Sequence, residues 1–134
     1  MLREILDLVA PRACLICGCR LAVQEKAMCT SCNMTLPRTN FAEHALENTM
    51  AQLFWGRIKH MEKAAAWIYY IPQTKVDYLL FALKYHFHPE YGEYFGNLMA
   101  NEMKNTGFFD GIDCILPIPL TKERRRKRGY NQSE

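Results

Sequence analysis

Apolar residues recur at helical spacing in three stretches of the chain. The first stretch covers residues 2–9 and is ended by Pro11. The same spacing predicts a second helix over residues 75–86, broken by Pro89, and a third over residues 91–103. The alternation of apolar and polar positions therefore indicates one helix near the N-terminus and a pair of helices in the second half of the chain.

Two shorter stretches predict β-strands. Residues 64–71 are rich in small, aromatic and β-branched side chains and end at Pro72. Residues 113–118 predict a short buried strand, which includes Cys114 and ends in a loop made rigid by Pro117 and Pro119. The order strand, helix, helix, strand predicts an α/β domain. Because the chain is too short for the crossovers of a doubly wound sheet, we expect an incomplete domain and a fragment of a longer protein.

The cysteines form the clearest chemical pattern. Five of the six lie between Cys14 and Cys32, in two C-x-x-C pairs (Cys14 with Cys17, and Cys29 with Cys32) separated by eleven residues. Zn²⁺ prefers four thiolate or imidazole ligands in a tetrahedron, and two tight turns can each supply two thiolates. We therefore predict a closed, structural Zn²⁺ site, with residues 19–28 forming the short hairpin of a zinc ribbon.

Other readings of the cysteines remain open. Paired disulfides conflict with a reducing compartment, and a redox-active C-x-x-C lacks a thioredoxin-type context. Cys19 is a spare thiol that would replace Cys17 as a ligand only by distorting the turn. Gly18 and Asn33 each follow a C-x-x-C pair, and both residue types tolerate a left-handed backbone.

The positive charge of the chain is concentrated in one segment. The 134 residues include 17 basic and 14 acidic side chains, for a net charge of +3. Residues 122–128 contain six cations and one anion, so this segment alone contributes +5 and the rest of the chain carries −2. This distribution argues against an evenly basic nucleic-acid-binding surface and indicates a local anion site.

Composition and the N-terminal sequence bear on the cellular location of the protein. An apolar content of 49% is typical of a globular protein and argues against general disorder. The sequence has no apolar run of the roughly eighteen residues that a membrane span needs. Glu4 and Asp7 stand where a signal peptide requires apolar residues. We therefore expect a cytoplasmic protein without membrane insertion.

The segment after the second predicted strand is the candidate anion site. Ligands of open α/β sheets bind beyond the C-terminal ends of the strands, and guanidinium groups match phosphate oxygens. Gly129 would permit close backbone approach, and Asn131 would cap a following helix. A solvated basic loop without a ligand and a nucleic-acid or nuclear-import patch are the alternatives. The candidate anion-binding residues are Pro117, Ile118, Pro119, Leu120, Thr121, Arg124, Arg125, Arg128, Gly129 and Asn131.

These features predict three segments. Residues 1–38 would form the N-terminal helix and the four-cysteine zinc ribbon. Residues 39–62 would form a connector with a short helix. Residues 63–134 would form the first, truncated part of the α/β domain.

Six motifs follow one another along the chain. They are Pro11 with C-x-x-C-G, the second C-x-x-C, Phe54-Trp55-Gly56-Arg57, Leu79-Leu80-x-x-Leu83-Lys84-Tyr85, Pro117-Ile-Pro119-Leu and Arg128-Gly-Tyr-Asn-Gln132. Their order resembles the ComF family, and the similarity covers essentially the whole chain. The resemblance implies a zinc ribbon joined to a type I phosphoribosyltransferase-like domain, associated with DNA uptake in natural competence. It also implies phosphoribosyl pyrophosphate or a nucleotide-like molecule as ligand, with the pyrophosphate held by residues 117–121 and Mg²⁺ on the diphosphate.

One departure from the family pattern limits what this chain is expected to do. The acidic-acidic-Thr-Thr-Gly signature, which holds the ribose hydroxyls and the 5′-phosphate, is absent from the sequence. We therefore expect this chain alone to be inactive, and the sequence identifies no catalytic residue. The alternative is a non-enzymatic adaptor whose ribbon and basic segment bind single-stranded DNA or a DNA-uptake partner such as a competence helicase.

Overall fold

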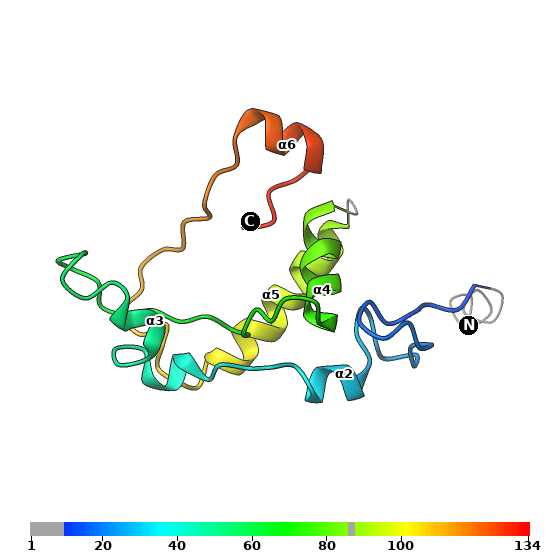
Figure 1. Cartoon of the computed structure of the whole chain (residues 1–134), viewed down its shortest axis with the longest axis horizontal. Helices are drawn as coiled ribbons and strands as arrows, with labels where there is room; N and C mark the ends of the chain where they lie inside the picture. Colours follow the sequence, from blue (N-terminus) through cyan, green and yellow to red (C-terminus); the bar gives the residue numbers. More distant parts are fainter. Residues whose placement is uncertain (1–9, 86–87) are drawn as a thin grey trace. The chain divides into compact units, whose positions relative to one another are not determined.

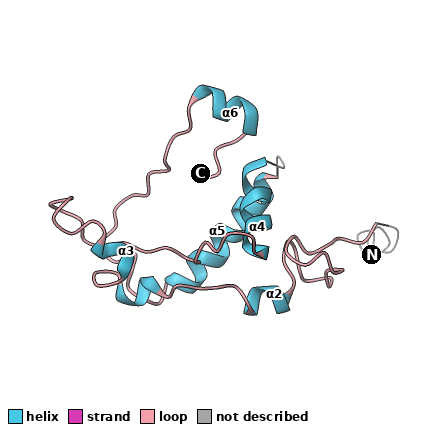
Figure 2. Cartoon of the chain, in the orientation of Figure 1, coloured by secondary structure: helices cyan, strands magenta, loops and turns pink. Residues whose placement is uncertain are grey.

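The computed structural model describes residues 10–85 and 88–134 and is helical (Figures 1 and 2). Over these residues there is no strand, and β pairing is limited to two isolated antiparallel bridges, Ala13 with Arg20 and Arg38 with Ile68. The helix predicted over residues 2–9 lies outside the described residues. The elements are α2 (Thr30–Met34), the 3-10 helix η1 (Phe41–His44), α3 (Thr49–Gln52), α4 (Lys75–Tyr85), α5 (Pro89–Met103) and α6 (Lys122–Arg128).

The pair of helices predicted in the second half is confirmed. Helix α4 buries Val76, Leu79 and Ala82, which follow one another at spacings of three residues. Helix α5 begins at Pro89, which the sequence analysis treated as a break between helices. Proline is favoured in the first turn of a helix, where its missing N–H has no partner to lose. The predicted end of the first helix at His86 lies outside the described residues.

The strand predicted over residues 64–71 is reduced to a single bridge. The N–H of Thr39 donates to the carbonyl of Trp67 at 3.1 Å, and the N–H of Tyr69 donates to the carbonyl of Pro37 at 2.8 Å. Pro37 has no N–H of its own, so the ladder cannot be extended past it. The segment is therefore extended without forming a regular strand.

The buried strand predicted over residues 113–118 is not formed. The segment is extended, but Ile115 and Leu116 are 77% and 83% exposed, and Cys114 is exposed rather than buried. An extended segment becomes a strand only through hydrogen bonds to a neighbouring strand, which is missing from the described part of the chain. The described residues accordingly do not show the predicted α/β domain.

The chain divides into two compact units, each assembled from separate segments. The first unit contains residues up to 36, residues 70–94 and residues 117–134, and the second contains residues 37–69 and 95–116. The predicted linear division at residues 38 and 62 stays a prediction.

A buried asparagine organises the N-terminal part of the second unit. The side chain of Asn48 caps α3 by accepting from the N–H of Ala51 at 2.9 Å. Its amide donates to the carbonyls of Ala64 at 2.7 Å, His44 at 3.0 Å and Phe41 at 3.2 Å. One side chain thus connects η1, α3 and the extended segment after residue 63, where the sequence predicted only a connector with a short helix.

The same unit contains a charged cluster around Glu102 on α5. Arg38 donates to both carboxylate oxygens, from Nε at 2.9 Å and from Nη2 at 2.6 Å, and the indole N–H of Trp67 donates at 2.6 Å. The Arg38 guanidinium also lies 5.9 Å from the centre of the Trp67 ring. The hydrogen bonds from Arg38, and then that from Trp67, lower the pKa of the Glu102 carboxyl.

We predict that the indole N–H of Trp67 reports the protonation of Glu102. Because the folded-state pKa is lowered, the ion pair contributes its full stability above the ordinary Glu pKa of about 4.3 and loses it as the pH falls through the lower folded value. In a ¹⁵N NMR titration, the Trp67 indole resonance should move with a midpoint below about 4.3. The Arg38→Gln variant should raise that midpoint.

The exposed Trp55 indole is the internal control for this titration. Its resonance should not follow the Glu102 transition. A Trp67 midpoint at or above the ordinary Glu value in the parent protein would contradict the predicted coupling.

Candidate functional site

The first C-x-x-C pair lies in a tight turn closed by backbone hydrogen bonds. The N–H of Gly18 donates to the carbonyl of Cys14 at 2.8 Å, and the N–H of Cys14 donates to the carbonyl of Cys19 at 2.8 Å. Gly18 has φ of +73°, as the sequence predicted for a residue that must tolerate a left-handed backbone. The turn therefore presents Cys14, Cys17 and Cys19 within one short loop.

The second C-x-x-C pair lies at the start of α2. Cys29 is the N-cap residue, and its Sγ accepts from the N–H of Cys32 at 3.4 Å. The N–H of Asn33 donates to the carbonyl of Cys29 at 2.9 Å. Asn33 is inside the helix, so the left-handed backbone predicted for it is wrong. A helical turn brings Cys32 back toward Cys29 without requiring a strained residue.

The segment between the pairs is a loop organised by Glu25, not the predicted hairpin. The Glu25 carboxylate accepts from the backbone N–H groups of Ala22 at 2.8 Å and Thr30 at 2.6 Å, and from the Thr30 hydroxyl at 2.8 Å. These bonds, first that from Ala22, lower the pKa of Glu25. The loop also receives a bond from Arg12, whose Nη1 donates to the Glu25 carbonyl at 2.7 Å. Side-chain bonds therefore replace the β-ladder of a ribbon hairpin.

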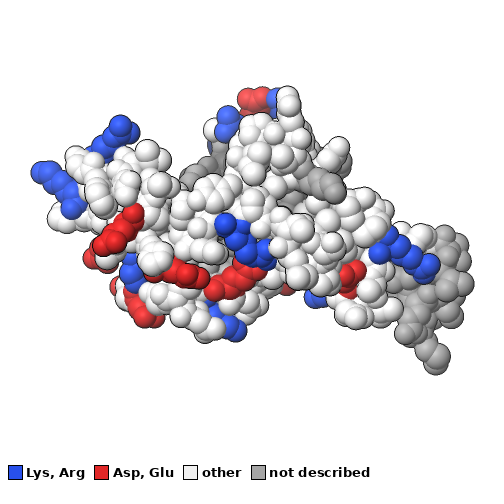
Figure 3. Space-filling view, turned by 60° about the horizontal axis from the view of Figure 1, so that its bottom comes forward, with Lys and Arg blue, Asp and Glu red and all other residues white. Residues whose placement is uncertain are grey.

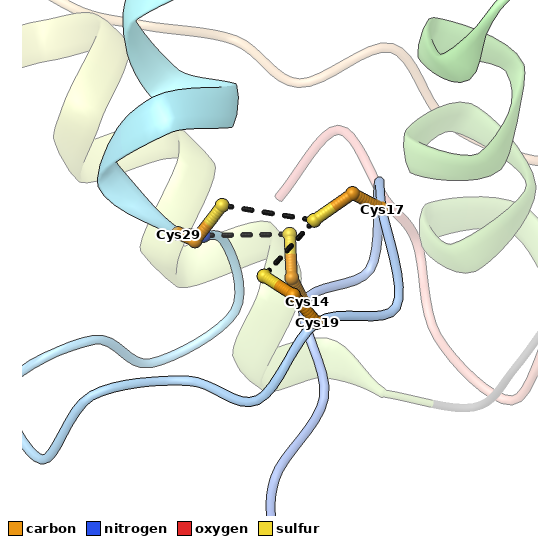
Figure 4. Close-up of side chains that lie close together, drawn as sticks. All are labelled: Cys14, Cys17, Cys19 and Cys29. Carbon is orange, nitrogen blue, oxygen red and sulfur yellow. Dashed lines mark hydrogen bonds between the residues drawn. The ribbon is translucent and has the colours of Figure 1, made fainter.

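Four cysteine sulfurs converge in this module. Figure 4 shows the side chains of Cys14, Cys17, Cys19 and Cys29 pointing toward one another, and their Sγ atoms all lie within 4.8 Å of one another. The Cys17 and Cys29 sulfurs are 3.7 Å apart, and the N–H of Cys29 donates to the Cys14 sulfur at 3.4 Å. The cluster could hold a metal ion such as Zn²⁺.

The separations distinguish two kinds of sulfur pair. Four thiolates bound to one Zn²⁺ at about 2.3 Å lie about 3.8 Å apart at tetrahedral angles. The Cys17–Cys29 distance of 3.7 Å agrees with this value, whereas Cys17 and Cys19 are only 3.1 Å apart. Cys17 and Cys19, as placed, do not fit two corners of the same tetrahedron.

The fourth predicted ligand, Cys32, adjoins the same cluster. Burial, and then hydrogen bonding with the thiols of Cys17, Cys29 and Cys14, raise the pKa of Cys32. The structure thus brings together three predicted ligands with Cys19, which the sequence treated as spare, and places Cys32 beside them. Cys114 belongs to the second unit and is exposed.

The two exposed thiols of the cluster have opposite acidities. Hydrogen bonding with Cys19 lowers the pKa of Cys17 to about 6, whereas hydrogen bonding with Cys17 raises the pKa of Cys19 to about 12. Cys17 is therefore the more acidic of the two exposed thiols.

The predicted anion-binding residues form an extended segment, a short helix and a tail. Pro117–Leu120 is extended, and the Thr121 hydroxyl accepts from the N–H of Arg124 at 3.3 Å as the N-cap of α6. Arg124 and Arg125 are exposed, and Gly129 ends the helix with φ of +76°. The sequence expected a loop where α6 forms.

The tail after α6 is tied back onto the same unit. The buried Asn131 donates to the carbonyl of Ile118 at 3.1 Å, so it closes the segment rather than capping a helix as predicted. The Tyr130 hydroxyl donates to the carbonyl of Leu83 at the end of α4. Nη1 of Arg128 donates to the side-chain oxygen of Gln132 at 2.7 Å. The last of the resembling motifs therefore holds residues 118–131 and α4 together.

An aromatic groove on α4 was not predicted from the sequence. It has a volume of about 290 Å³ and carries both an acidic and a basic side chain. The Arg128 guanidinium lies 5.7 Å from the centre of the Tyr85 ring, and the Phe81 and Tyr85 ring centres are 5.6 Å apart. The sequence feature that could have indicated this groove is the presence of aromatic residues, such as Phe81 and Tyr85, on the exposed face of the predicted helix. The lining residues are Tyr70, Asp77, Leu80, Phe81, Lys84 and Tyr85.

Comparisons with protein-family models, with curated proteins and with solved structures find no match for this chain. The helices described here are all too short or too polar to cross a membrane.

We predict that Cys32, not Cys19, completes a metal tetrahedron with Cys14, Cys17 and Cys29. Cys32→Ser should lower the affinity for Zn²⁺ by at least about tenfold, because a closed structural site needs four ligands. Cys19→Ser should keep one Zn²⁺ per chain. Competition with a chromogenic chelator, together with elemental analysis, measures both values. Loss of zinc from Cys19→Ser and its retention by Cys32→Ser would overturn this assignment.

Proposed function

We propose that the cysteine module is a structural zinc centre with Cys14, Cys17, Cys29 and Cys32 as ligands. The observation that carries this proposal is the convergence of Cys14, Cys17 and Cys29, with 3.7 Å between the Cys17 and Cys29 sulfurs and with Cys32 beside them. Bound Zn²⁺ would supply folding free energy to a module that otherwise buries few large side chains. All four coordination positions are filled by protein, so the ion has no open position for a substrate.

We further propose that the chain is part of a ComF-like protein of the phosphoribosyltransferase family, associated with DNA uptake. The order of its motifs supports this proposal. The ligand would be phosphoribosyl pyrophosphate or a nucleotide-like molecule, with Mg²⁺ on the diphosphate. The intact protein would exchange pyrophosphate and a nitrogenous base at the anomeric carbon of ribose, whereas this chain alone would bind without catalysing the exchange.

The anion would be held by the segment from Pro117 to Asn131. Arg124 and Arg125 are exposed and unpaired with acidic groups in the described structure, whereas Lys127 pairs with Glu123 at 2.8 Å. On the face drawn in Figure 3, basic and acidic side chains are interspersed, whereas α6 carries six cations and one anion in seven residues. Guanidinium groups bind phosphate oxygens with paired hydrogen bonds, which favours a diphosphate as ligand.

We predict that replacing Arg124, Arg125 and Arg126 by Gln weakens the binding of phosphoribosyl pyrophosphate with Mg²⁺ by at least about tenfold, because charge-assisted bonds are lost. Calorimetry on the zinc-loaded chain measures the affinity. Arg57→Gln with Lys59→Gln, exposed cations in the second unit, is the matched control. If the zinc-loaded parent chain binds no phosphoribosyl pyrophosphate, the ligand proposal fails while the zinc proposal stands.

The second candidate function is a non-enzymatic adaptor that binds single-stranded DNA. The aromatic groove on α4 favours it, because bases stack on aromatic rings and Arg128 lies beside Tyr85 in the same unit as the basic helix α6. In this case α6 would contact phosphates and the groove would contact bases.

We predict for this adaptor that Phe81→Ala and Tyr85→Ala each weaken binding of an oligothymidylate by about 1–3 kcal/mol, the usual contribution of one stacked base. The Arg124–Arg126 replacement should instead flatten the salt dependence. Fluorescence anisotropy at several salt concentrations separates the two effects. Trp55→Ala, an exposed aromatic in the second unit, should leave binding unchanged. Equal effects of all three aromatic variants would contradict a stacking site on α4.

A further inference from the structure

The cysteine centre contains one thiol more than a tetrahedral ion can bind. Cys14, Cys17, Cys19 and Cys29 converge within 4.8 Å, and the buried Cys32 adjoins them. The 3.1 Å between Cys17 and Cys19 is shorter than the roughly 3.8 Å between two thiolates on one Zn²⁺. Because the Cys17 sulfur lies 3.7 Å from that of Cys29, as expected for two ligands of one ion, Cys19 is the surplus thiol and lies against a ligand.

Cys17 and Cys19 are also the accessible members of the centre. Both are exposed, whereas Cys14, Cys29 and Cys32 are buried. The intervening Gly18 has no neighbouring atom within 4 Å of the place where a Cβ would stand, so the turn has room to adjust. A disulfide needs the sulfurs to approach from 3.1 Å to about 2.05 Å, a shift of roughly 1 Å.

We propose that Cys17 and Cys19 form a peroxide-sensitive dithiol that releases the metal when it is oxidised. This inference rests on the proposed zinc centre and assigns it a regulatory chemistry. The pair is the oxidation site because its two sulfurs are in contact, both are accessible to solvent, and one of them, Cys17, is a proposed ligand of the ion.

The oxidation is balanced by one molecule of a peroxide. The Cys17 thiolate attacks one peroxide oxygen, the O–O bond breaks and hydroxide leaves, which produces a sulfenic acid. The Cys19 thiol then attacks the Cys17 sulfur, the S–S bond forms and the sulfenic oxygen leaves as water. For hydrogen peroxide, the sum is two thiols oxidised to one disulfide and the peroxide reduced to two waters.

Loss of Cys17 as a ligand opens the centre. The sulfur of a disulfide is no longer a thiolate, so three thiolates remain for the ion and Zn²⁺ is released. Metal loss would in turn loosen the loop that the ion holds together. A thiol reductant reverses the disulfide by exchange and restores the ligand set.

The test treats the zinc-loaded full chain with hydrogen peroxide and follows Zn²⁺ release with a chromogenic chelator. Trypsin cleavage after Arg12 and Arg20 yields the fragment 13–20, which contains Cys14, Cys17 and Cys19. Fragment mass spectrometry should find a disulfide between Cys17 and Cys19, with Cys14 available for alkylation. Zinc release should follow the appearance of this disulfide, and dithiothreitol with added Zn²⁺ should restore binding.

Two variants distinguish zinc release that depends on Cys19 from zinc release caused by oxidation of any cysteine. Cys19→Ser should bind Zn²⁺ but release it at least about tenfold more slowly under peroxide, since the sulfenic acid has no adjacent thiol to trap it. Cys114→Ser, an exposed cysteine outside the centre, should release zinc as fast as the parent. If Cys19→Ser releases zinc at the parent rate, or if Cys17 pairs with another cysteine, the inference is wrong. A parent chain that never binds zinc would refute the zinc centre itself, even if the disulfide forms.

Discussion

The cysteine module of the first unit is organised around the close approach of its thiols. In the cysteine module, the buried apolar side chains beside Cys14, Cys29 and Cys32 are Ile16, Leu21, Ala27, Met28 and Leu36. A module of this size builds only a small core, and the Glu25 hydrogen bonds fix its backbone without adding to that core. A cation among the sulfurs would join the two turns, so metal binding would be coupled to the folding of this module.

The second unit contains polar junctions between its segments, of which the one at Asn48 is buried. Asn48 joins three segments through four hydrogen bonds, and Glu102 receives bonds from Arg38 and Trp67. Lys63 adds a third such junction, since its Nζ donates to the carbonyls of Gly107 at 2.9 Å and Asp110 at 2.8 Å. Asn48 is the buried member of this set, and because its amide is fully paired it specifies one arrangement of the loops around it.

Periodicity predicted the long helices because their burial is decided locally. The i, i+3 pattern of Val76 and Leu79 needs only one neighbouring surface, and both are buried in α4. The prediction of a strand over residues 113–118 was wrong, because an extended segment needs a hydrogen-bonded partner strand. The local sequence pattern does not specify whether such a partner exists. The cysteine spacing predicted the thiol cluster, which could hold a metal ion, but could not show that Cys19 joins it, because Gly18 turns the chain through a left-handed residue. The run of cations over residues 122–128 indicated a loop, but Thr121 caps this run and Gly129 ends it, so it forms helix α6.

The basic segment now has a physical reason to attract an anion. Six cations lie on a helix of seven residues, and the Glu123–Lys127 pair neutralises only part of that charge. Cations near a helix C-terminus are favourable, yet neighbouring like charges repel one another. A bound phosphate would relieve this repulsion whichever ligand carries it. The α4 groove distinguishes the two proposed ligands. A single-stranded nucleic acid would stack its bases on the rings of Phe81 and Tyr85, whereas a diphosphate would make no use of these rings.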